Sequence, residues 1–492
     1  MTGRAPTSAR GRTPHSRSPR RWWVLLVALV AVATALTSFL VARHGDRDVT
    51  ADPAGSGTDD APMAFGVLGS RCDAQRAAAL HEAGVRYAEY GLDWSSFEPR
   101  AGQFDADYEG EVKRAVAACH KAGIGVVLTL GLHAAPTWVA DLRGGAYVDQ
   151  GGQRGPDDVP NLVFSAAVRD AVKDYLTELD QVVGLDSLAA IRVGTGTNGE
   201  LGYPSGDTST DNPFWAFDQA AQTGTGLADG ATPSPMPGWE PGSTTWRGAA
   251  VSTADVQRWF DWYSSSVADA VVWVVRELRD LGYTHDVHLP LAGRGALPAD
   301  LRKAVAAHLD GTADRDGSLE SGLYYPDQLT RIGEALKQTE QPGWGTVSAD
   351  SGSVDDATAV HARRLDPPQD RCRSDDADHD LIGDAAVADW PSYRWTAANA
   401  RRAGLGLVGE NPGSPNTPGT GGNDDTDSSE EQMDIAPQYA AECGMTLFQW
   451  AFEDDLFSHG RQGLTSYADR IDALAADPRS TASANGTTGG GR

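Results

Sequence analysis

Short apolar runs alternate with longer helical stretches along most of this chain, and this alternation constrains the fold more than any other feature. The apolar runs are bounded by glycine or polar residues and lack clean alternation, which is typical of strands buried on both faces. They cover residues 64–68, 85–90, 125–130, 189–193, 287–291, 345–349, 406–408 and 446–450. The helical stretches cover residues 73–83, 107–122, 165–182, 253–281, 299–308, 325–339, 391–403 and 434–443. Eight strand–helix units predict an α/β fold, a (β/α)8 TIM barrel with long βα loops, in preference to a doubly wound open sheet.

The N-terminal segment differs from the rest of the chain. Residues 1–21 carry several Arg and no acidic residue, and residues 22–42 form an uncharged, mostly apolar run. A run of about 20 apolar residues can span a bilayer, and the Arg-rich flank predicts a cytoplasmic tail over residues 1–21. We therefore expect one transmembrane helix that anchors an extracytoplasmic protein in the cell membrane. The alternative is a cleaved signal segment and a secreted protein, because Ala33-Thr34-Ala35 resembles a cleavage site.

Two further segments are predicted to lie outside the barrel. Residues 43–61 are polar with Gly, Pro and Asp, and we expect a linker there. Residues 479–492 are rich in Ser, Thr and Gly, and we expect a disordered tail. The barrel is then expected over residues 62–478.

The chain has four cysteines, at positions 72, 119, 372 and 443, and none form a C-x-x-C pair. A zinc or thioredoxin-type site is therefore disfavoured. In an oxidising compartment two disulfides can form, with three connectivities open. The pairs Cys72–Cys119 and Cys372–Cys443 would each join neighbouring units of the barrel.

The acidic residues outnumber the basic ones, and the formal net charge is -27. This balance argues against nucleic acid as a partner, since proteins meet its phosphates with Lys and Arg. The acids are scattered along the chain, so we interpret them as a solvated surface that keeps an exported protein soluble.

The stretch IRVGTGTNGELGYPSG contains a literal G-x-G-x-x-G at Gly194, Gly196 and Gly199. A dinucleotide-binding loop leads directly into a helix whose N-terminus binds the pyrophosphate, but the residues that follow here cannot start a long helix. We interpret the glycines as letting the backbone turn tightly and approach a ligand. Asn198 and Glu200 would then project from the end of the fourth strand into the barrel mouth. An oxidoreductase that uses this loop for a nucleotide remains an alternative.

A second carboxyl group, Glu410, directly follows the seventh predicted strand. Glycosidic bond cleavage needs two carboxyl groups on either side of the scissile bond, and strands four and seven face each other across a barrel of eight. We therefore pair Glu410 with Glu200 as the catalytic residues. Asp350 after the sixth strand and Glu453 after the eighth are the competing partners. This chemistry needs no cofactor.

Other side chains near the predicted strand ends suit a carbohydrate. Sugars present apolar C–H faces and many hydroxyls, so their sites combine aromatic rings with short polar groups. His133 has no second His at ligand spacing, so we expect it to bind a hydroxyl rather than a metal. The expected substrate-binding residues are Asp93, Trp94, His133, Trp138, Asn198, Tyr203, Asp350, Trp450 and Glu453.

Two runs resemble clan A glycoside hydrolases, notably family 42 β-galactosidases. YAEYGLDWSSFEPRAGQFD is similar to that family's second-strand run W-S-x-x-E-P-x-x-G-x-F/Y-D, and LGLHAAPTWV is similar to its third-strand run T-x-A-A-P-x-W-L. The clan is retaining, with an acid/base on strand four and a nucleophile on strand seven. The resemblance implies these roles for Glu200 and Glu410, and it places Trp450 at the Trp common to the end of strand eight.

The segment around Glu200 departs from the clan. Gly199 stands between Asn198 and Glu200, whereas the clan's acid/base follows Asn directly. VGTGTNGELGYPS instead resembles the β-amylase motif G-x-G-x-x-G-E-L-R-Y-P-S, whose Glu is the general acid of an inverting enzyme. Gly202 replaces the Arg of that motif, and the β-amylase run H-x-C-G-G-N-V-G-D is missing, because His133 is followed by Ala-Ala-Pro-Thr.

These resemblances imply a glycoside hydrolase that cleaves O-glycosidic bonds of an oligo- or polysaccharide. Glu200 would be the general acid, and Glu410 the nucleophile or, in an inverting enzyme, the base that activates water. The alternatives are a β-amylase-like α-glucan hydrolase and a catalytically inactive barrel that binds glycan.

Overall fold

The computed structural model describes residues 62–204, 212–313, 317–352, 354, 371–411, 429–458 and 463–476. The predicted cytoplasmic tail, the anchor at 22–42, the linker and the C-terminal tail lie outside these residues. Within the described part, no helix is both long enough and apolar enough to cross a bilayer.

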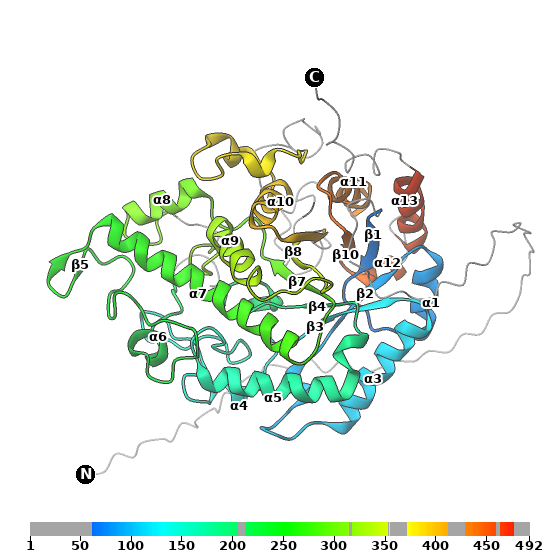
Figure 1. Ribbon diagram of the computed structural model, residues 1–492, viewed down its shortest axis with the longest axis horizontal. Helices are drawn as coiled ribbons and strands as arrows, with labels where there is room; N and C mark the ends of the chain where they lie inside the picture. The colour runs from blue at the N-terminus through cyan, green and yellow to red at the C-terminus, as the bar shows by residue number, and fades with distance from the viewer. Residues whose placement is uncertain are drawn as a thin grey trace, which may run out of the picture. The chain divides into compact units, whose positions relative to one another are not determined.

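Eight parallel strands close into a barrel, as the sequence predicted (Figure 1). In order around the barrel they are β1 (Ala64–Val67), β2 (Tyr87–Gly91), β3 (Gly125–Thr129), β4 (Ala190–Arg192), β7 (Asp286–Leu291), β8 (Val347–Ser351), β9 (Gly406–Glu410) and β10 (Leu447–Trp450). Two bounds differ from expectation in a way that matters for the site. Asp350 lies within β8 rather than after it, and Glu410 is the last residue of β9.

A helix follows each barrel strand and packs on the outside. These helices are α1 (Ala74–Glu82), α3 (Ala106–Lys121), α5 (Ala166–Val183), α7 (Thr253–Asp280), α9 (Tyr325–Leu336), α10 (Ser392–Ala403), α11 (Ser429–Glu442) and α13 (Leu464–Ala476). The sequence predicted all of them except α13. The helix expected at 299–308 is present as α8 (Pro298–Ala306), but it lies in the connection from β7 to α9.

The helix starts follow from local chemistry. Asp73 and Asp105 accept hydrogen bonds from the first backbone N–H groups of α1 and α3, and Ser252 with Asp255 forms a capping box at α7. These side chains satisfy backbone donors that have no partner within the helix.

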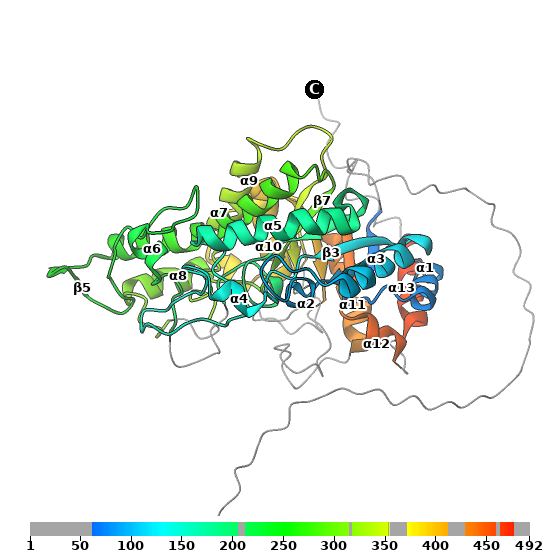
Figure 2. The same cartoon turned by 90° about the horizontal axis from the view of Figure 1, so that it is seen from below.

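The connection from β4 to α7 is long and carries its own elements. It contains α6 (Gln219–Thr223) and a two-stranded hairpin of β5 (Thr245–Trp246) and β6 (Ala249–Ala250), none of which the sequence predicted. Figures 1 and 2 show α6 and β5 on the side of the barrel opposite to α1 and α13.

The barrel interior has an apolar layer below a polar one. Val127, Ala190, Val408 and Leu447 form a buried cluster inside the barrel. Side chains two residues apart on a strand point to the same side, so the next inward positions on the same strands form a second layer. Those positions are Thr129, Arg192, Glu410 and Gln449, and His288 and Ser348 continue the same row, since His288 pairs with Arg192 and Ser348 with His288. Glu89 pairs with Val127 and Asp350 with Val408, so these two side chains also point inward.

Both disulfides are present. Cys72 pairs with Cys119 and Cys372 with Cys443. The first joins the segment before α1 to α3, and the second joins the segment before α10 to the end of α11. The structure therefore selects one of the three connectivities, the one that links neighbouring units.

Candidate active site

Glu200 is held by the backbone of the loop that follows β4. The N–H groups of Thr195 and Gly196 both donate to the carbonyl oxygen of Glu200, over 3.0 and 2.9 Å. The next residue, Leu201, donates to the carbonyl of Pro290 on β7 over 2.7 Å. Glu200 is therefore fixed between β4 and β7 at the carboxyl end of the barrel, where barrel active sites are built.

The three glycines of the loop allow this backbone path. A Cβ at Gly194 would lie 1.9 Å from the carbonyl oxygen of Gly199, and one at Gly196 would lie 2.8 Å from that of Tyr203. Gly199 has a positive φ of 75°, and a Cβ there would lie 2.9 Å from Nδ1 of His133. Only a short 3-10 turn, Thr197–Gly199, forms in the loop. The glycines serve close backbone approach, and within residues 200–204 and 212–218, which the structure describes, no helix follows that could bind a pyrophosphate.

Glu410 is held by side chains instead. Nη2 of Arg192 donates to Oε2 of Glu410 over 2.9 Å and lies 3.2 Å from Oδ2 of Asp350. The side chains of Arg192, Asp350 and Glu410 are 9%, 1% and 16% exposed. One guanidinium thus pairs with two carboxyl groups almost entirely out of water.

The protonation of the two glutamates is set by burial and by Arg192. Burial raises the pKa of Glu200 to about 7, against a weaker lowering by Arg192. Burial also raises the pKa of Glu410, and Arg192 opposes this rise while the negative charges of Asp350, Glu200 and Glu89 add to it. Because the guanidinium donates a hydrogen bond to Glu410 and none to Glu200, it favours the ionised form of Glu410, while burial raises the pKa of that carboxyl to about 8.

Two neutral imidazoles lie near this group. Burial lowers the pKa of His133, which packs against Gly199 and is half-buried. Burial also lowers the pKa of His288, on β7 beside Arg192, to about 4. Nδ1 of each ring has no hydrogen-bond partner among the described residues. Both rings are therefore uncharged near neutral pH.

The structure brings together only part of the predicted set. Glu200, Glu410 and Asp350 lie around Arg192, and His133 lies beside the Glu200 loop. Asn198 is exposed in that loop, with a left-handed φ of 59°.

Three of the expected sugar-binding rings are packed in the protein interior. Trp94 is 0% exposed, stacks on Tyr175 and donates its indole N–H to the carboxylate of Glu98. Tyr203 is 1% exposed and stacks on Tyr263 at a centroid distance of 4.1 Å. These two rings present no surface to a ligand, so their assignment as substrate-binding residues is wrong.

The third ring is Trp450. It is 1% exposed and packs on Tyr467 of α13, outside the barrel. The register explains this correction: Gln449 pairs with Glu410, so Gln449 points inward and Trp450 points outward. Phe452, two residues further, is the exposed aromatic after β10, and its ring lies against Gly69 at the end of β1.

Glu453 is also turned away from the site. Its carboxylate is 1% exposed and pairs with Arg76 of α1 over 3.1 Å. Its backbone N–H donates to the carbonyl of Leu68. Glu453 therefore anchors the segment after β10 to α1, and its assignments as a competing catalytic residue and as a substrate-binding residue are wrong.

Asp93 and Trp138 both have structural partners. Asp93 caps the short helix α2 (Trp94–Phe97) by accepting from Ser96 N–H over 3.1 Å and from the Ser95 hydroxyl over 2.5 Å. Trp138 is half-buried and donates its indole N–H to the carbonyl of Glu98.

Sequence reasoning missed six of the inward polar residues, namely Glu89, Thr129, Arg192, His288, Ser348 and Gln449. Glu89 is 7% exposed and accepts from the N–H of Gly69 over 2.8 Å. Gln449 is 0% exposed and lies beside Glu410 in the register. For Thr129, Arg192 and Gln449 the available signal was a polar residue inside a predicted strand, two positions after an apolar residue that points inward.

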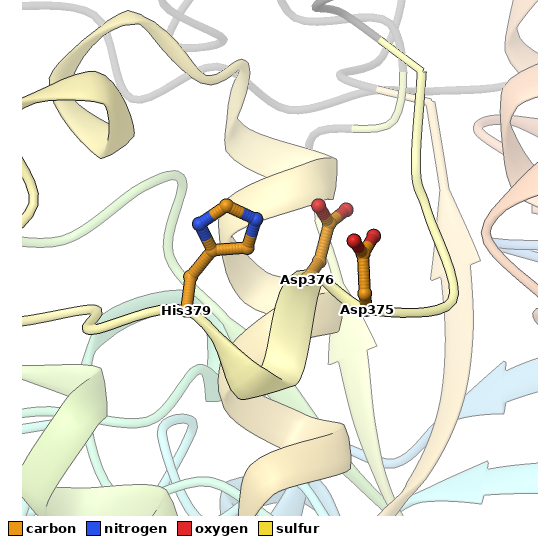
Figure 3. Close-up of side chains that lie close together, drawn as sticks. All are labelled: Asp375, Asp376 and His379. Atoms are coloured by element: carbon orange, nitrogen blue, oxygen red, sulfur yellow. The ribbon is translucent and has the colours of Figure 1, made fainter.

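A group of potential metal ligands lies far along the chain from these residues. Figure 3 shows Asp375, Asp376 and His379 close together, with ligand atoms within 4.8 Å of one another. Asp376 is fully buried and accepts two hydrogen bonds from Arg394 of α10, over 3.0 and 2.7 Å. His379 contacts the carboxylate of Asp384. The Asp376 carboxylate is neutralised by Arg394, so we interpret the group as a clamp that fixes this segment to α10.

The fold is similar to that of several solved structures. Comparison with known protein families and with curated protein sequences gives no match. Among solved structures, the chain is similar to the catalytic domain of β-amylase from Paenibacillus polymyxa, with a TM-score of 0.53 and 16% identity over 86% of this chain and 100% of that one. This match confirms, for the fold, the resemblance inferred from the motif around Glu200.

Weaker matches are β-galactosidases. That of the Antarctic haloarchaeon Halorubrum lacusprofundi has a TM-score of 0.49 and 16% identity over 86% of this chain and 57% of that one. That of Bacillus circulans sp. alkalophilus has a TM-score of 0.48 and 12% identity over 84% and 56%. The chain spans a little more than half the length of each β-galactosidase.

Proposed function

We propose that this protein is a glycoside hydrolase that cleaves O-glycosidic bonds of an oligo- or polysaccharide. The observation that supports this most is the pairing of two carboxyl groups, Glu200 after β4 and Glu410 at the end of β9, both within the influence of Arg192. Two such groups on opposing strands are the minimum that glycosidic cleavage requires.

Glu200 is the general acid. Its pKa of about 7 keeps a proton available near neutral pH, and a general acid works best when its pKa lies near the working pH. In the reaction the carboxyl proton moves to the glycosidic oxygen as the bond to the anomeric carbon breaks. Glu200 then carries a negative charge, the form that its burial disfavours, so it readily takes a proton back.

Glu410 is the carboxylate on the opposite side. It attacks the anomeric carbon in a retaining enzyme, as in the clan A resemblance, or removes a proton from the attacking water in an inverting one. The hydrogen bond from Arg192 to Oε2 favours the charged form that either role needs.

A second candidate is inverting hydrolysis of an α-glucan. The fold match covers all of the β-amylase catalytic domain, and the G-x-G-x-x-G-E-L run is shared with the β-amylase motif. Gly202 limits this candidate: its φ is 143°, and a Cβ there would lie 3.1 Å from both Leu323 Cδ2 and the Ser321 carbonyl oxygen. An Arg at this position would therefore strain the backbone and require Leu323 or Ser321 to shift.

The test is hydrolysis by the full chain of a panel of aryl glycosides and α-glucan oligosaccharides, with the product anomer followed by NMR. We expect turnover of at least one substrate, and the first anomer formed assigns retention or inversion. Glu200→Gln is the matched control, since it keeps the side-chain volume and removes the acid. Binding of glycan without turnover by the wild type would instead support an inactive barrel.

We also propose that the protein acts outside the cytoplasm, anchored by residues 22–42. The supporting observations are the apolar run in the sequence and the two disulfides, which persist in oxidising compartments. Protease treatment of intact cells should degrade residues 62–478 and spare the N-terminal tail. Protection of the whole chain would contradict this location.

A further inference from the structure

Arg192 lies on one side of the barrel, and its guanidinium contacts carboxylates on the other side. It is the last residue of β4, and its guanidinium reaches carboxylates on β8 and β9. A strongly hydrated or flexible cation would not be confined here, whereas the planar guanidinium is suited to buried carboxylate pairs.

The same nitrogen of Arg192 contacts the carboxylates of Glu410 and Asp350. Nη2 is 2.9 Å from Glu410 Oε2 and 3.2 Å from Asp350 Oδ2. Among the described residues, Glu410 accepts no other side-chain hydrogen bond, so Oε2 is anchored and Oε1 remains available. Asp350 is more deeply buried than Glu410, and it competes for the guanidinium from the neighbouring strand.

Apart from Arg192, the groups described around Glu410 are either negatively charged or neutral. The charged groups that act on it are Glu89 from β2, Arg192 from β4, Glu200 from the following loop and Asp350 from β8. The side chain at the register position on β10 is the neutral Gln449, and His288 on β7 is uncharged. Arg192 is therefore the one cation among the described groups that act on Glu410.

We propose that Arg192 is a positioning residue that orients Glu410 and favours its ionised form, and that Asp350 limits this effect by sharing the guanidinium. The catalytic consequence rests on the proposed function, but the charge pairing does not. Removing Arg192 leaves two buried carboxyl groups without a cation, which favours their protonated forms. Removing the charge of Asp350 leaves Glu410 as the only carboxylate of the two that pairs with Arg192, which favours the ionised form of Glu410.

The first experiment measures the thermal midpoint of the full chain between pH 4.5 and pH 8, without any substrate. In Arg192→Gln the carboxyl pKa values rise in the folded state, so the folded protein binds more protons than the unfolded one and loses stability as the pH rises. The deficit relative to wild type should therefore grow from pH 4.5 to pH 8. Adding Glu410→Gln should remove much of that pH-dependent part. A deficit that is equal at all pH values, or is unchanged in the double variant, overturns the pairing.

The second experiment measures kcat/KM against pH. Arg192→Gln should lower kcat about 10- to 100-fold with little change in KM, and it should move the acidic limb up by about 1–3 pH units. Asp350→Asn should move that limb down, and Arg192→Lys should restore part of the activity because it keeps the charge. The proposed role is overturned if the acidic limb of the pH–rate profile does not move, or if it moves in the same direction in Arg192→Gln and Asp350→Asn.

A matched control separates these effects from general loss of stability. Arg279 is also a buried arginine in an ion pair, with Glu340, and it bonds the carbonyls of His285 and Gly345 just before β7 and β8, at the opposite end of the barrel. Arg279→Gln should lower the thermal midpoint and leave the pH–rate limbs unchanged. If the wild type shows no turnover on any substrate while the first experiment gives the expected linkage, the proposed function fails and the charge pairing stands.

Discussion

The two walls of the barrel mouth hold their carboxyl groups in different ways. On the β4 wall, backbone N–H groups fix the main chain of Glu200, and no cation is bonded to its side chain among the described residues. On the β9 wall, Glu410 ends a regular strand, and Arg192 bonds its carboxylate. The comparison shows that two buried carboxyl groups of the same residue type can differ in their surroundings: the guanidinium of Arg192 favours the ionised form of Glu410, and no bonded cation does so at Glu200.

The largest expected effect is on kcat/KM: its dependence on the leaving group of the substrate should differ between Glu200→Gln and Glu410→Gln. Glu200→Gln should lose about 10²–10⁴-fold in kcat/KM on natural glycosides, whose leaving oxygen needs a proton. It should lose far less on aryl glycosides whose phenol departs without one. Glu410→Gln should lose activity equally on both kinds of substrate, since its role does not depend on the leaving group. Steady-state kinetics on a series of aryl glycosides measures this difference.

Folding must be intact for this comparison to hold. The circular dichroism spectra of both variants should match that of the wild type, because Gln replaces Glu with almost no change in volume. The assignment is wrong if Glu410→Gln recovers with a better leaving group and Glu200→Gln does not, because the acid would then be on the β9 wall.

A smaller effect is expected from the backbone of the β4 wall. Gly199→Ala places a Cβ 2.9 Å from Nδ1 of His133 at a φ of 75°, so the loop must shift and move Glu200. We expect kcat to fall about 100-fold, the cost of a displacement near 1 Å at a catalytic group. Gly184→Ala is the control, because Gly184 has a φ of 67° with nothing within 4 Å of its Cβ and caps α5 away from the site. It should cost stability by a similar strain and leave kcat unchanged.

The sequence predicted the barrel because its signal is repeated. Eight buried strands and the helices between them each add a weak indication, and an error of one or two residues in any of them leaves the fold unchanged. The positions of Glu200 and Glu410 at the carboxyl end of the barrel could also be predicted, since a residue at the end of a strand or in the loop after it lies at that end whatever the exact register.

The same uncertainty of one residue explains why the sequence could not predict which strand side chains point into the barrel. A shift by one position moves a strand side chain from the inside of the barrel to the outside. Trp450 was therefore expected at the mouth, although Gln449 occupies the inward position. Arg192 was hidden for the same reason: within an apolar run, only the register shows that it points inward toward Glu410. The caps and ion pairs of Asp93 and Glu453 depend on tertiary contacts that no local pattern reports.

The smallest expected effect is on stability, and it follows from the raised pKa of Glu200. A carboxyl whose pKa rises from its ordinary value of 4.5 to about 7 on folding makes the folded state bind more protons between these pH values. Stability is therefore lost as the pH rises through this window, and the loss is complete above pH 7. The side chain in Glu200→Gln stays neutral and does not lose this stability. The variant should therefore melt about 1–3 °C above the wild type at pH 8 and at the same temperature as the wild type at pH 4.5. Burial raises the pKa of Glu410 as well, to about 8, but Glu410→Gln also removes the charge-assisted hydrogen bond from Arg192, so this variant should show a smaller gain. Differential scanning calorimetry of the three proteins at both pH values measures the two gains, and a gain larger for Glu410→Gln than for Glu200→Gln would show that Arg192 does not distinguish the two walls.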